Sequence, residues 1–496
     1  MRRRFIYIAV FLLTGISFMI AAQDSLSLYQ VSTPGWRSAA YSEITPALLK
    51  DRIVYLVDRN NTGKKSIRRN SSREMERAVN ILYAVDKKDG KLEGREYDYA
   101  PELATASDRN GLCFNKQGTR MYLGKSRIEN ARRPNETGYG IFESVLQNGR
   151  WSDPVEIAAL ADQKSANSNT SHPALSQDGR RIYFSSNRQG GLGGYDIWYS
   201  DSKGGQWQAP VNMGAPVNTE NDEAYPVVNP DGRLYFSSNN SARTGVNNRK
   251  LDIFYTEIIN GNWIVPVRLG TPFNTQRFDD FHLILTDASF NSGYFCSDRE
   301  TRKKSDIFAF RVNFPEFPEE KPVEELSLCF LFEESEGIQI DTNLTMWQWE
   351  FDDMEKVRAL TAVHCFPGVG EYSVKLNIYD KLTKTITGNQ TTYTLRIDSI
   401  EQPYFSCSDT IRVNEVVSFS GAPSYTPNLL TRNFYWKFRK TDDVKEKDAV
   451  VDSGEDVLYR FKSPGKYRIL LGIKGVPVDP SYTDRLASYR EIVVVR

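Results

Sequence analysis

Three aspartates recur at one position of a repeated Asp-Ile-aromatic block, and their spacing is the clearest hint of chemistry in the chain. They are Asp196, Asp252 and Asp306. Such carboxylates could hold a cation, or act as the acid and base that cleave a glycosidic bond. A residue that returns in each repeat is more often a turn or capping group. We therefore predict a structural role for the three aspartates and no catalytic residue.

Other signatures of catalysis are missing from the sequence. The chain has only 3 His, which argues against a multi-histidine metal centre. It lacks the Gly-x-Ser-x-Gly pattern of a nucleophile elbow. His172-Pro173 and Phe281-His282 align with Tyr225-Pro226, so repeat position explains these two histidines. We expect no metal, no cofactor and no enzymatic activity.

The aspartates belong to a longer repeat that must position them. Ser176–Arg188 and Asn229–Asn240 share an Asp-Gly turn followed by Tyr-Phe-Ser-Ser-Asn, and weaker copies precede and follow them. Asp-Gly favours a tight turn, and the flanking apolar residues favour short strands. Three of the units contain Gly-x-Trp, whose tryptophans we expect to pack between neighbouring sheets: Trp151, Trp207 and Trp263.

A four-stranded unit cannot bury both of its faces alone, so the units must stack around an axis. Five copies predict a propeller of five blades over residues 23–314, with six blades as the alternative. The strand-like segment 26–36 resembles the late strand of a blade whose earlier strands are absent, and the last unit lacks its final strand. We expect the N-terminal strand to complete that blade and to remove its free edge.

Two basic loops interrupt blades one and two at the same place, between the first and second strand blocks of the repeat. We therefore expect them on one face of the propeller. Their basic residues could bind an acidic partner or an envelope polyanion; the alternative is a solvated insertion. The residues that we predict to contact a partner are Lys64, Lys65, Arg68, Arg69, Arg73, Arg132 and Arg133. With 63 basic and 63 acidic residues, the chain has no net field that would favour nucleic acid.

The repeat resembles the WD40-like propeller repeats of the TolB type, as found in envelope proteins of the Bacteroidota. The resemblance rests on Tyr-Phe-Ser-Ser-Asn, Gly-Gly-Tyr-Asp-Ile-Trp, Gly-x-Trp-x-x-Pro and Asn-Thr-x-x-Asp-Glu. It is specific in blades three and four and looser elsewhere. It implies a rigid disc that binds other proteins.

The last third of the chain has a different pattern. A Pro-rich stretch, 315–322, predicts a linker. Trp-Gln-Trp-Glu-Phe-Asp-Asp-Met and the later His364-Cys-Phe resemble the polycystic-kidney-disease (PKD) type of Ig-like sandwich, with Asp352-Asp353-Met354 in place of the family's Gly-Asp-Gly. A degenerate second copy follows. We predict two all-β sandwiches, residues 323–398 and 399–496, which serve as contacts or spacers.

The first residues have the pattern of a signal peptide, predicted to span 1–22. Three arginines precede the apolar run Phe5–Ile20, and Ala21-Ala22 offers a cleavage point. A retained membrane anchor is the alternative, because the run nearly spans a bilayer. Of the five cysteines, Cys329 and Cys365 fall in one predicted sandwich and could pair.

These patterns predict an exported, non-enzymatic envelope scaffold in the periplasm, at the outer membrane or at the cell surface. The resemblance suggests envelope proteins as partners, and an outer-membrane, type IX secretion or gliding machine as the setting. Two alternatives stay open. One is a surface adhesin or glycan-binding protein, and the other is a propeller hydrolase acting on glycans.

Overall fold

The structure, a computed structural model, is almost entirely β. It describes residues 28–37, 42–58, 80–88, 91–92, 95–103, 109–127, 138–162, 168–240, 250–300, 304–334, 337–442 and 450–496. Within these ranges the only helical elements are two short 3-10 turns, η1 (Pro101–Leu103) and η3 (Ala158–Leu160). None of the described residues forms a helix that could cross a membrane. The predicted all-β fold class is confirmed, whereas the predicted signal peptide lies outside the described residues.

The chain divides into two compact units, the first ending at Phe314 and the second beginning at Pro315. In the described part of unit 1, five sheets follow one another along the chain, each of four or five strands. The strands of the first three sheets are β2 (Ser42–Leu49), β3 (Arg52–Asp58), β4 (Asn80–Lys88), β5 (Lys91–Leu92) and β6 (Tyr97–Asp98); β7 (Arg109–Phe114), β8 (Arg120–Ser126), β9 (Tyr139–Gln147), β10 (Arg150–Trp151) and β11 (Val155–Glu156); and β12 (Thr170–Leu175), β13 (Arg181–Ser186), β14 (Asp196–Lys203), β15 (Gln206–Trp207) and β16 (Val211–Asn212).

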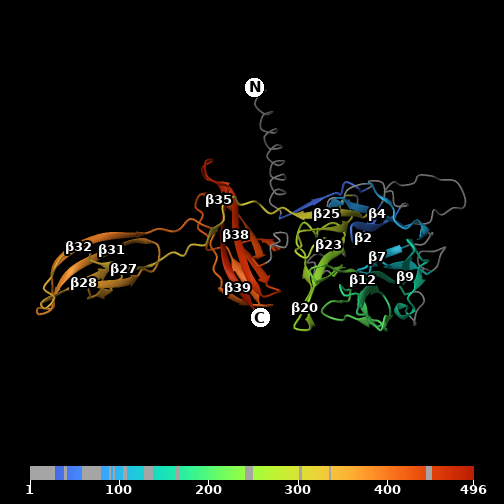
Figure 1. Ribbon diagram of the computed structural model, residues 1–496, viewed down its shortest axis with the longest axis horizontal. Helices are drawn as coiled ribbons and strands as arrows, with labels where there is room; N and C mark the ends of the chain where they lie inside the picture. The colour runs from blue at the N-terminus through green and yellow to red at the C-terminus, as the bar shows by residue number, and fades with distance from the viewer. Residues whose placement is uncertain are drawn as a thin grey trace, which may run out of the picture. The chain divides into compact units, whose positions relative to one another are not determined.

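The last two sheets complete a ring, which makes unit 1 a β-propeller. Their strands are β17 (Glu223–Val228), β18 (Leu234–Ser238), β19 (Asp252–Thr256) and β22 (Val267–Arg268), with a side hairpin of β20 (Ile258–Ile259) and β21 (Asn262–Trp263); and β23 (Asp280–Leu285), β24 (Ser292–Ser297), β25 (Asp306–Val312) and β1 (Tyr29–Ser32). The innermost strands β2, β7, β12, β17 and β23 each contact the next one around the axis, and β23 returns to β2. Figure 1 shows β2, β23 and β25 close together although they come from opposite ends of the unit.

The N-terminal strand closes the ring as the sequence predicts. β1 pairs antiparallel with β25, with Tyr29 opposite Val312 and Ser32 opposite Ala309. The last sheet therefore combines three strands from the end of the unit with one from its start. This arrangement covers the edge of β25 that would otherwise stay unpaired.

The repeated Asp-Gly and related turns have one structure in three sheets. Gly118, Gly179 and Gly232 take positive φ values of 72°, 70° and 83°. In each turn the glycine N–H donates to the carbonyl oxygen three residues earlier, at 2.9 Å. Glycine suits this position because it has no Cβ to oppose a positive φ. These turns connect each innermost strand to the second strand of its sheet.

The tryptophans of the Gly-x-Trp element lie between successive sheets. Trp151 packs with residues of the first and second sheets, Trp207 with the second and third, and Trp263 with the third and fourth. The Trp151 ring contacts Tyr99 and Phe114, with ring centroids 6.2 and 6.0 Å away. Large aromatic rings at these positions bury apolar surface from two blades at once, which holds the blades together.

All five innermost strands carry a bulge at the same place. The pairing register shifts within each strand, and one residue there has a positive φ between 48° and 86°. These residues are Thr45, Gly111, His172, Tyr225 and His282. The bulge aligns His282, and not Phe281, with Tyr225. The sequence alignment of this blade was wrong by one residue, because Leu283 replaces the proline that follows the bulge in its neighbour.

Replacing Gly111 by alanine should destabilise unit 1. A Cβ at Gly111 would lie 2.7 Å from the backbone Cα of His172 in the neighbouring blade. Gly149 is a matched control, since its φ of 79° is close to the 86° of Gly111 but nothing lies within 4 Å. Both variants incur the positive-φ penalty of about 1 kcal/mol. We expect Gly111→Ala to cost about 2 kcal/mol more than Gly149→Ala in urea unfolding; equal losses would contradict the close packing at the bulge.

Unit 2 holds two separate hydrophobic cores, each between two sheets. The first lies between the sheet of β28 (Thr345–Phe351), β29 (Lys356–Val357), β31 (Gly370–Asp380) and β32 (Ile386–Ile397) and the pair β27 (Cys329–Glu333) and β30 (Thr361–Cys365). The second lies between the sheet of β26 (Lys321–Pro322), β33 (Thr410–Arg412), β35 (Leu429–Lys440), β36 (Val450–Ser453), β38 (Gly465–Pro477) and β39 (Arg485–Val495) and the pair β34 (Val416–Ser420) and β37 (Asp456–Arg460). Trp349 and Trp436 are among the largest fully buried side chains of the two cores.

Two features of unit 2 bear on the predicted organisation. The end of the predicted linker, Lys321–Pro322, forms β26, which pairs in parallel with β39 of the second core. Cys329 and Cys365 lie directly opposite each other on β27 and β30 and form a disulfide. The possible pairing of these two cysteines is therefore realised in the structure.

Candidate functional site

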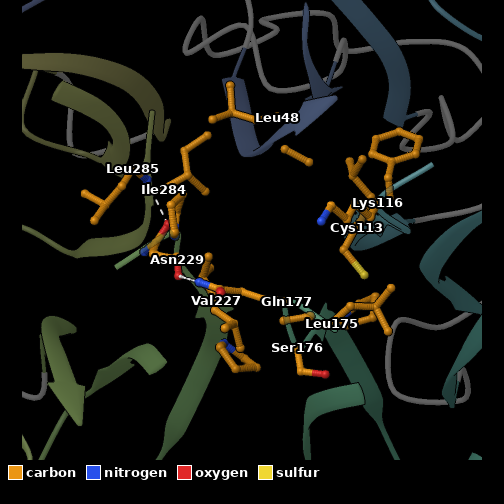
Figure 2. Close-up of a pocket in the computed structure, with 18 of the residues that line it drawn as sticks. Leu48, Cys113, Lys116, Leu175, Ser176, Gln177, Val227, Asn229, Ile284 and Leu285 are labelled. Carbon is orange, nitrogen blue, oxygen red and sulfur yellow. Dashed lines mark hydrogen bonds between the residues drawn. The ribbon is translucent and has the colours of Figure 1, made fainter. Parts of the chain in front are cut away.

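The propeller encloses a central cavity of about 460 Å³. All five innermost strands contribute to its wall, through the residues that follow their bulges. Figure 2 shows Leu48, Leu175, Val227 and Ile284 around the open centre. Most of the lining residues are apolar, and no described residue of the lining is an aspartate or a glutamate. The cavity is therefore suited to an apolar guest.

Lys116 is the charged residue of this lining at neutral pH. It lies in the turn after β7, and Figure 2 shows its amino group directed into the open centre. Its side chain is exposed at the mouth, and it makes no hydrogen bond or ion pair with any residue that the structure describes. Lys116 can thus meet a negative group on whatever enters the cavity.

The mouth of the cavity continues into a groove of about 640 Å³ between the second and third blades. Lys116, Leu175, Gln177 and Gly179 line both spaces. Unlike the cavity, the groove has a polar lining that includes charged residues of both signs. An extended chain could therefore place an apolar end in the cavity and a polar portion in the groove.

The carboxylates of the groove are already engaged. Glu143 accepts a hydrogen bond from Arg120 at 2.8 Å, and Glu156 accepts one from Arg127 at 2.6 Å. Asp178 accepts hydrogen bonds within its own turn, chiefly from Ser176, which lower the pKa of its carboxyl group. A general acid of a glycosidase needs a raised pKa. The lowered pKa of Asp178 is the opposite of what such an acid needs, and Glu143 and Glu156 are each held by an arginine.

We call the bulge residues the floor of the cavity, because His282 lines it and the other four directly precede residues that line it. His172 Nε2 lies 2.8 Å from Asn110 Oδ1 of β7, and its ring lies 3.8 Å from the ring of Tyr225. The Nε2 of His282 donates to the backbone oxygen of Pro46 at 2.9 Å. These contacts link β12 to β7 and to β17, and β23 to β2. Such strained residues persist only where the surrounding structure holds them in place.

Burial keeps both floor histidines neutral. It lowers the pKa of His172 to about 3 and that of His282 to about 4. A general base works best with a pKa near the operating pH. Neither imidazole is matched to proton transfer near neutral pH, so the floor is a packing feature with polar contacts.

The three repeated aspartates lie elsewhere, each at the first residue of the third strand of its sheet. Asp196 accepts hydrogen bonds from the Leu192 N–H and from Asn212. Asp252 pairs with Arg268 at 2.8 Å. Burial raises the pKa of each of the three carboxyl groups.

The third aspartate, Asp306, lies 3.2 Å from Arg37 Nη1 and 3.1 Å from Lys304 Nζ. Each repeated aspartate thus has its own local partners. They lie at separate blades, and the structure does not bring them together in one cluster.

Two arginines at the same repeat position, Arg188 and Arg299, each join a blade to the segment that enters it. Arg188 donates to the Leu160 carbonyl oxygen at 2.7 Å and to Thr170 Oγ1 at 2.9 Å. Arg299 donates to the backbone oxygens of Pro272 and Phe273 and to Asp280. These contacts give Arg188 and Arg299 a structural, bridging role. The predicted partner-binding residues of the two basic loops, from Lys64 to Arg73 and Arg132–Arg133, lie outside the described residues.

Sequence reasoning missed Lys116 and Gln177, although a signal was present. Lys116, Gln177 and Pro230 occupy the same position of the repeated turn, directly after Asn115, Ser176 and Asn229. A position that varies while the turn around it is kept is free to differ in function. That variation is visible only when the repeats are aligned and the side on which the turns emerge is known.

Comparisons with known proteins add no family. No protein-family profile and no curated protein matches this chain. Among solved structures, TolB from Acinetobacter baumannii is similar at 12% identity and a TM-score of 0.28, with 55% of each chain covered. A family 117 glycoside hydrolase from Zobellia galactanivorans is similar at 10% identity and a TM-score of 0.36, over 58% of this chain and 91% of that one. A thermostable family-43 glycoside hydrolase is similar at 13% identity and a TM-score of 0.34, over 59% and 100%.

These likenesses are too distant to bear on function. This chain spans 55% of the length of the TolB structure, and all three TM-scores are low. The three structures include both a TolB and two hydrolases, so their names point in different directions. The site itself must carry the functional argument.

Proposed function

We propose that this protein is a non-enzymatic scaffold of the cell envelope, and that its propeller binds an extended segment of a partner protein. The observation that carries the proposal is the central cavity, which is apolar, walled by all five innermost strands and continuous with a polar groove. Apolar residues of the segment occupy the cavity, and an acidic group of the segment meets Lys116. Burial of apolar surface supplies the affinity, and the charge pair supplies orientation.

The chemistry of the site supports binding over hydrolysis. Glycoside hydrolysis uses two carboxyl groups that flank the scissile bond. The described lining of the cavity holds no carboxylate, and Glu143 and Glu156 of the groove are paired with arginines. The proposal therefore assigns no reaction to the propeller.

Two observations favour the envelope as the location. The predicted signal peptide directs the chain out of the cytoplasm, and the Cys329–Cys365 disulfide is typical of an oxidising compartment. The resemblance of the repeats to envelope proteins adds the expected setting, an outer-membrane or type IX secretion machine. A surface adhesin is distinguished by labelling intact cells with a membrane-impermeant reagent, which reaches an adhesin but not a periplasmic scaffold.

Crosslinking from the mouth of the cavity tests the proposal. A photoreactive phenylalanine analogue at Gln177 of the full-length protein should capture an envelope protein in intact cells. The same analogue at Ile258, which is 53% exposed on a hairpin away from both spaces, is the matched control. Equal adducts from both positions, or no protein adduct from Gln177, would overturn the proposal.

Charge reversal at Lys116 should weaken the captured complex. Lys116→Glu places a negative charge where the acidic group of the partner lies, and we expect about tenfold weaker binding, equivalent to about 1.4 kcal/mol. Arg150→Glu on the outer strand β10 is the control, since Arg150 is likewise exposed but lines neither space. The affinity is measured with the purified partner. Unchanged affinity in Lys116→Glu would remove the charge pair from the proposal.

A further inference from the structure

A buried histidine in the first core of unit 2 lacks hydrogen-bond partners. The His364 side chain is 1% exposed, and neither of its ring nitrogens forms a hydrogen bond. Its ring stacks on Phe351 with centroids 3.8 Å apart, and Phe366 contacts its edge at 4.7 Å. A buried polar group without a partner is costly, because it has lost its bonds to water. The structure therefore points to a missing partner at this imidazole.

Two carboxylates lie beside the same ring. Asp353 Oδ2 is 3.2 Å from Nε2, and Glu355 Oε2 is 3.0 Å from Nδ1. Neither oxygen lies in the direction in which a ring N–H would donate, so these contacts leave both nitrogens unsatisfied. One ligand atom from each of the three residues lies within 4.8 Å of the others.

We propose that Asp353, Glu355 and His364 bind one divalent transition-metal ion of the Zn²⁺ type. One imidazole nitrogen and two carboxylate oxygens are ligands that Zn²⁺ accepts, and water completes its coordination. The nitrogen ligand selects against Ca²⁺ and Mg²⁺, which prefer oxygen. The small number of histidines argues only against a multi-histidine centre, and a site with one histidine and two carboxylates lies outside that argument.

The fold fixes one of the three proposed ligands, His364, and leaves the two carboxylates exposed and free to adjust to a metal. His364 lies in β30, fixed by the stack on Phe351 and next to Cys365, whose disulfide ties β30 to β27. Asp353 and Glu355 lie between β28 and β29 and are 43% and 57% exposed. The Glu355 N–H donates to Asp353 Oδ1 at 3.0 Å, which turns the other carboxylate oxygen toward His364. Asp353 Oδ2 faces Nε2 and Glu355 Oε2 faces Nδ1, so one of these two exposed carboxylates must shift to bring both oxygens to the same nitrogen. Zn²⁺ ligands lie roughly 3.4 Å apart in a tetrahedral site.

Direct observation of the histidine tests the proposal. The chain has only 3 His, so a ¹⁵N-histidine-labelled full-length protein gives three imidazole spin systems. Adding Zn²⁺ should shift the ring nitrogens of His364 alone, at one equivalent, and Ca²⁺ or Mg²⁺ should not. His172 and His282 serve as internal controls, since they are buried in the propeller. A His364 signal that stays unchanged with saturating Zn²⁺ would overturn the proposal.

Variants of the exposed ligands make the test quantitative. Glu355→Gln and Asp353→Asn keep the shape of the turn, and each should weaken Zn²⁺ binding by at least the 10- to 100-fold typical of losing even an outer contact. Glu333→Gln, an exposed glutamate of β27 outside the cluster, should bind like the wild type. Affinities are measured by competition with a zinc-sensitive dye, and circular dichroism verifies folding. Wild-type affinity in both Glu355→Gln and Asp353→Asn would show that Zn²⁺ binds elsewhere.

Discussion

Lowering the pH from 7 to 4.5 should reduce the free energy of unfolding of the propeller by up to about 5 kcal/mol through His172 and His282. Burial lowers their pKa values in the folded state to about 3 and about 4. The unfolded chain has ordinary histidines with a pKa near 6.5. Below that pH the two histidines bind protons in the unfolded state but stay neutral in the folded state. The free energy of unfolding therefore falls until the pH reaches the pKa values of the folded state. Each histidine contributes about 1.4 kcal/mol per pH unit in this window.

Other buried groups act in the opposite direction. Burial raises the pKa of Asp196, Asp252 and Asp306, so the folded state binds protons there more readily than the unfolded state as the pH falls. That uptake offsets part of the histidine effect. The net slope of the wild type is therefore smaller than the histidine contribution alone.

The comparison of wild type and variants isolates the histidines. In His172→Asn and His282→Asn, asparagine tolerates the positive φ at both bulges but cannot take up a proton. The double variant should be less stable at pH 7. Between pH 6 and pH 4.5, its free energy of unfolding should depend on pH much less than that of the wild type. Urea unfolding at each pH, followed by hydrogen exchange of propeller amides, gives both quantities. Parallel slopes for wild type and double variant would contradict the assignment.

Removal of the disulfide should cost the first core of unit 2 about 4 kcal/mol, from the chain entropy of the loop that the bond closes. Cys329 and Cys365 are 36 residues apart in sequence. They join β27 to β30, a pair that forms its own two-stranded sheet over the core. Without the bond, the unfolded chain gains freedom, and this small sheet relies on its pairing and packing alone.

The double variant Cys329→Ala with Cys365→Ala tests this expectation. Cys407→Ala is the control, because Cys407 is a partly buried free thiol of the other core. Denaturant unfolding with hydrogen exchange resolved by segment should show the loss in residues 327–397 only. Reduction of the wild type should reproduce it. A loss below about 1 kcal/mol, the size of a typical single substitution, would show that the bond contributes little.

The repeat predicted much of the propeller because its signals are local. A glycine that takes a positive φ makes the same turn in three blades, so Gly118, Gly179 and Gly232 could be placed from the sequence. The missing last strand and the spare N-terminal segment together predicted the pairing of β1 with β25. These inferences need only the order of turns and strands along the chain.

The His282 bulge shows where local signals fail. Proline follows the bulge residue in three blades, after Thr45, His172 and Tyr225, and the alignment was right for the two of these that it covered, His172 and Tyr225. His282 is followed by leucine, and the alignment slipped by one residue. A bulge is decided by the pairing of two strands, so a single strand without its proline does not reveal it.

The sequence by itself determined the fold class, the repeating unit and the strand that closes the ring, because turn glycines and strand periodicity act over a few residues. Only the tertiary structure showed which residues form candidate binding sites. The central cavity takes its wall from five blades, and the cluster at His364 joins a turn after β28 to a residue of β30. Such sites depend on which side chains face each other after packing. Their residues are far apart in the sequence, so no local pattern reveals that they meet. Lys116 therefore became a candidate for binding only when the ring placed its amino group over an apolar cavity.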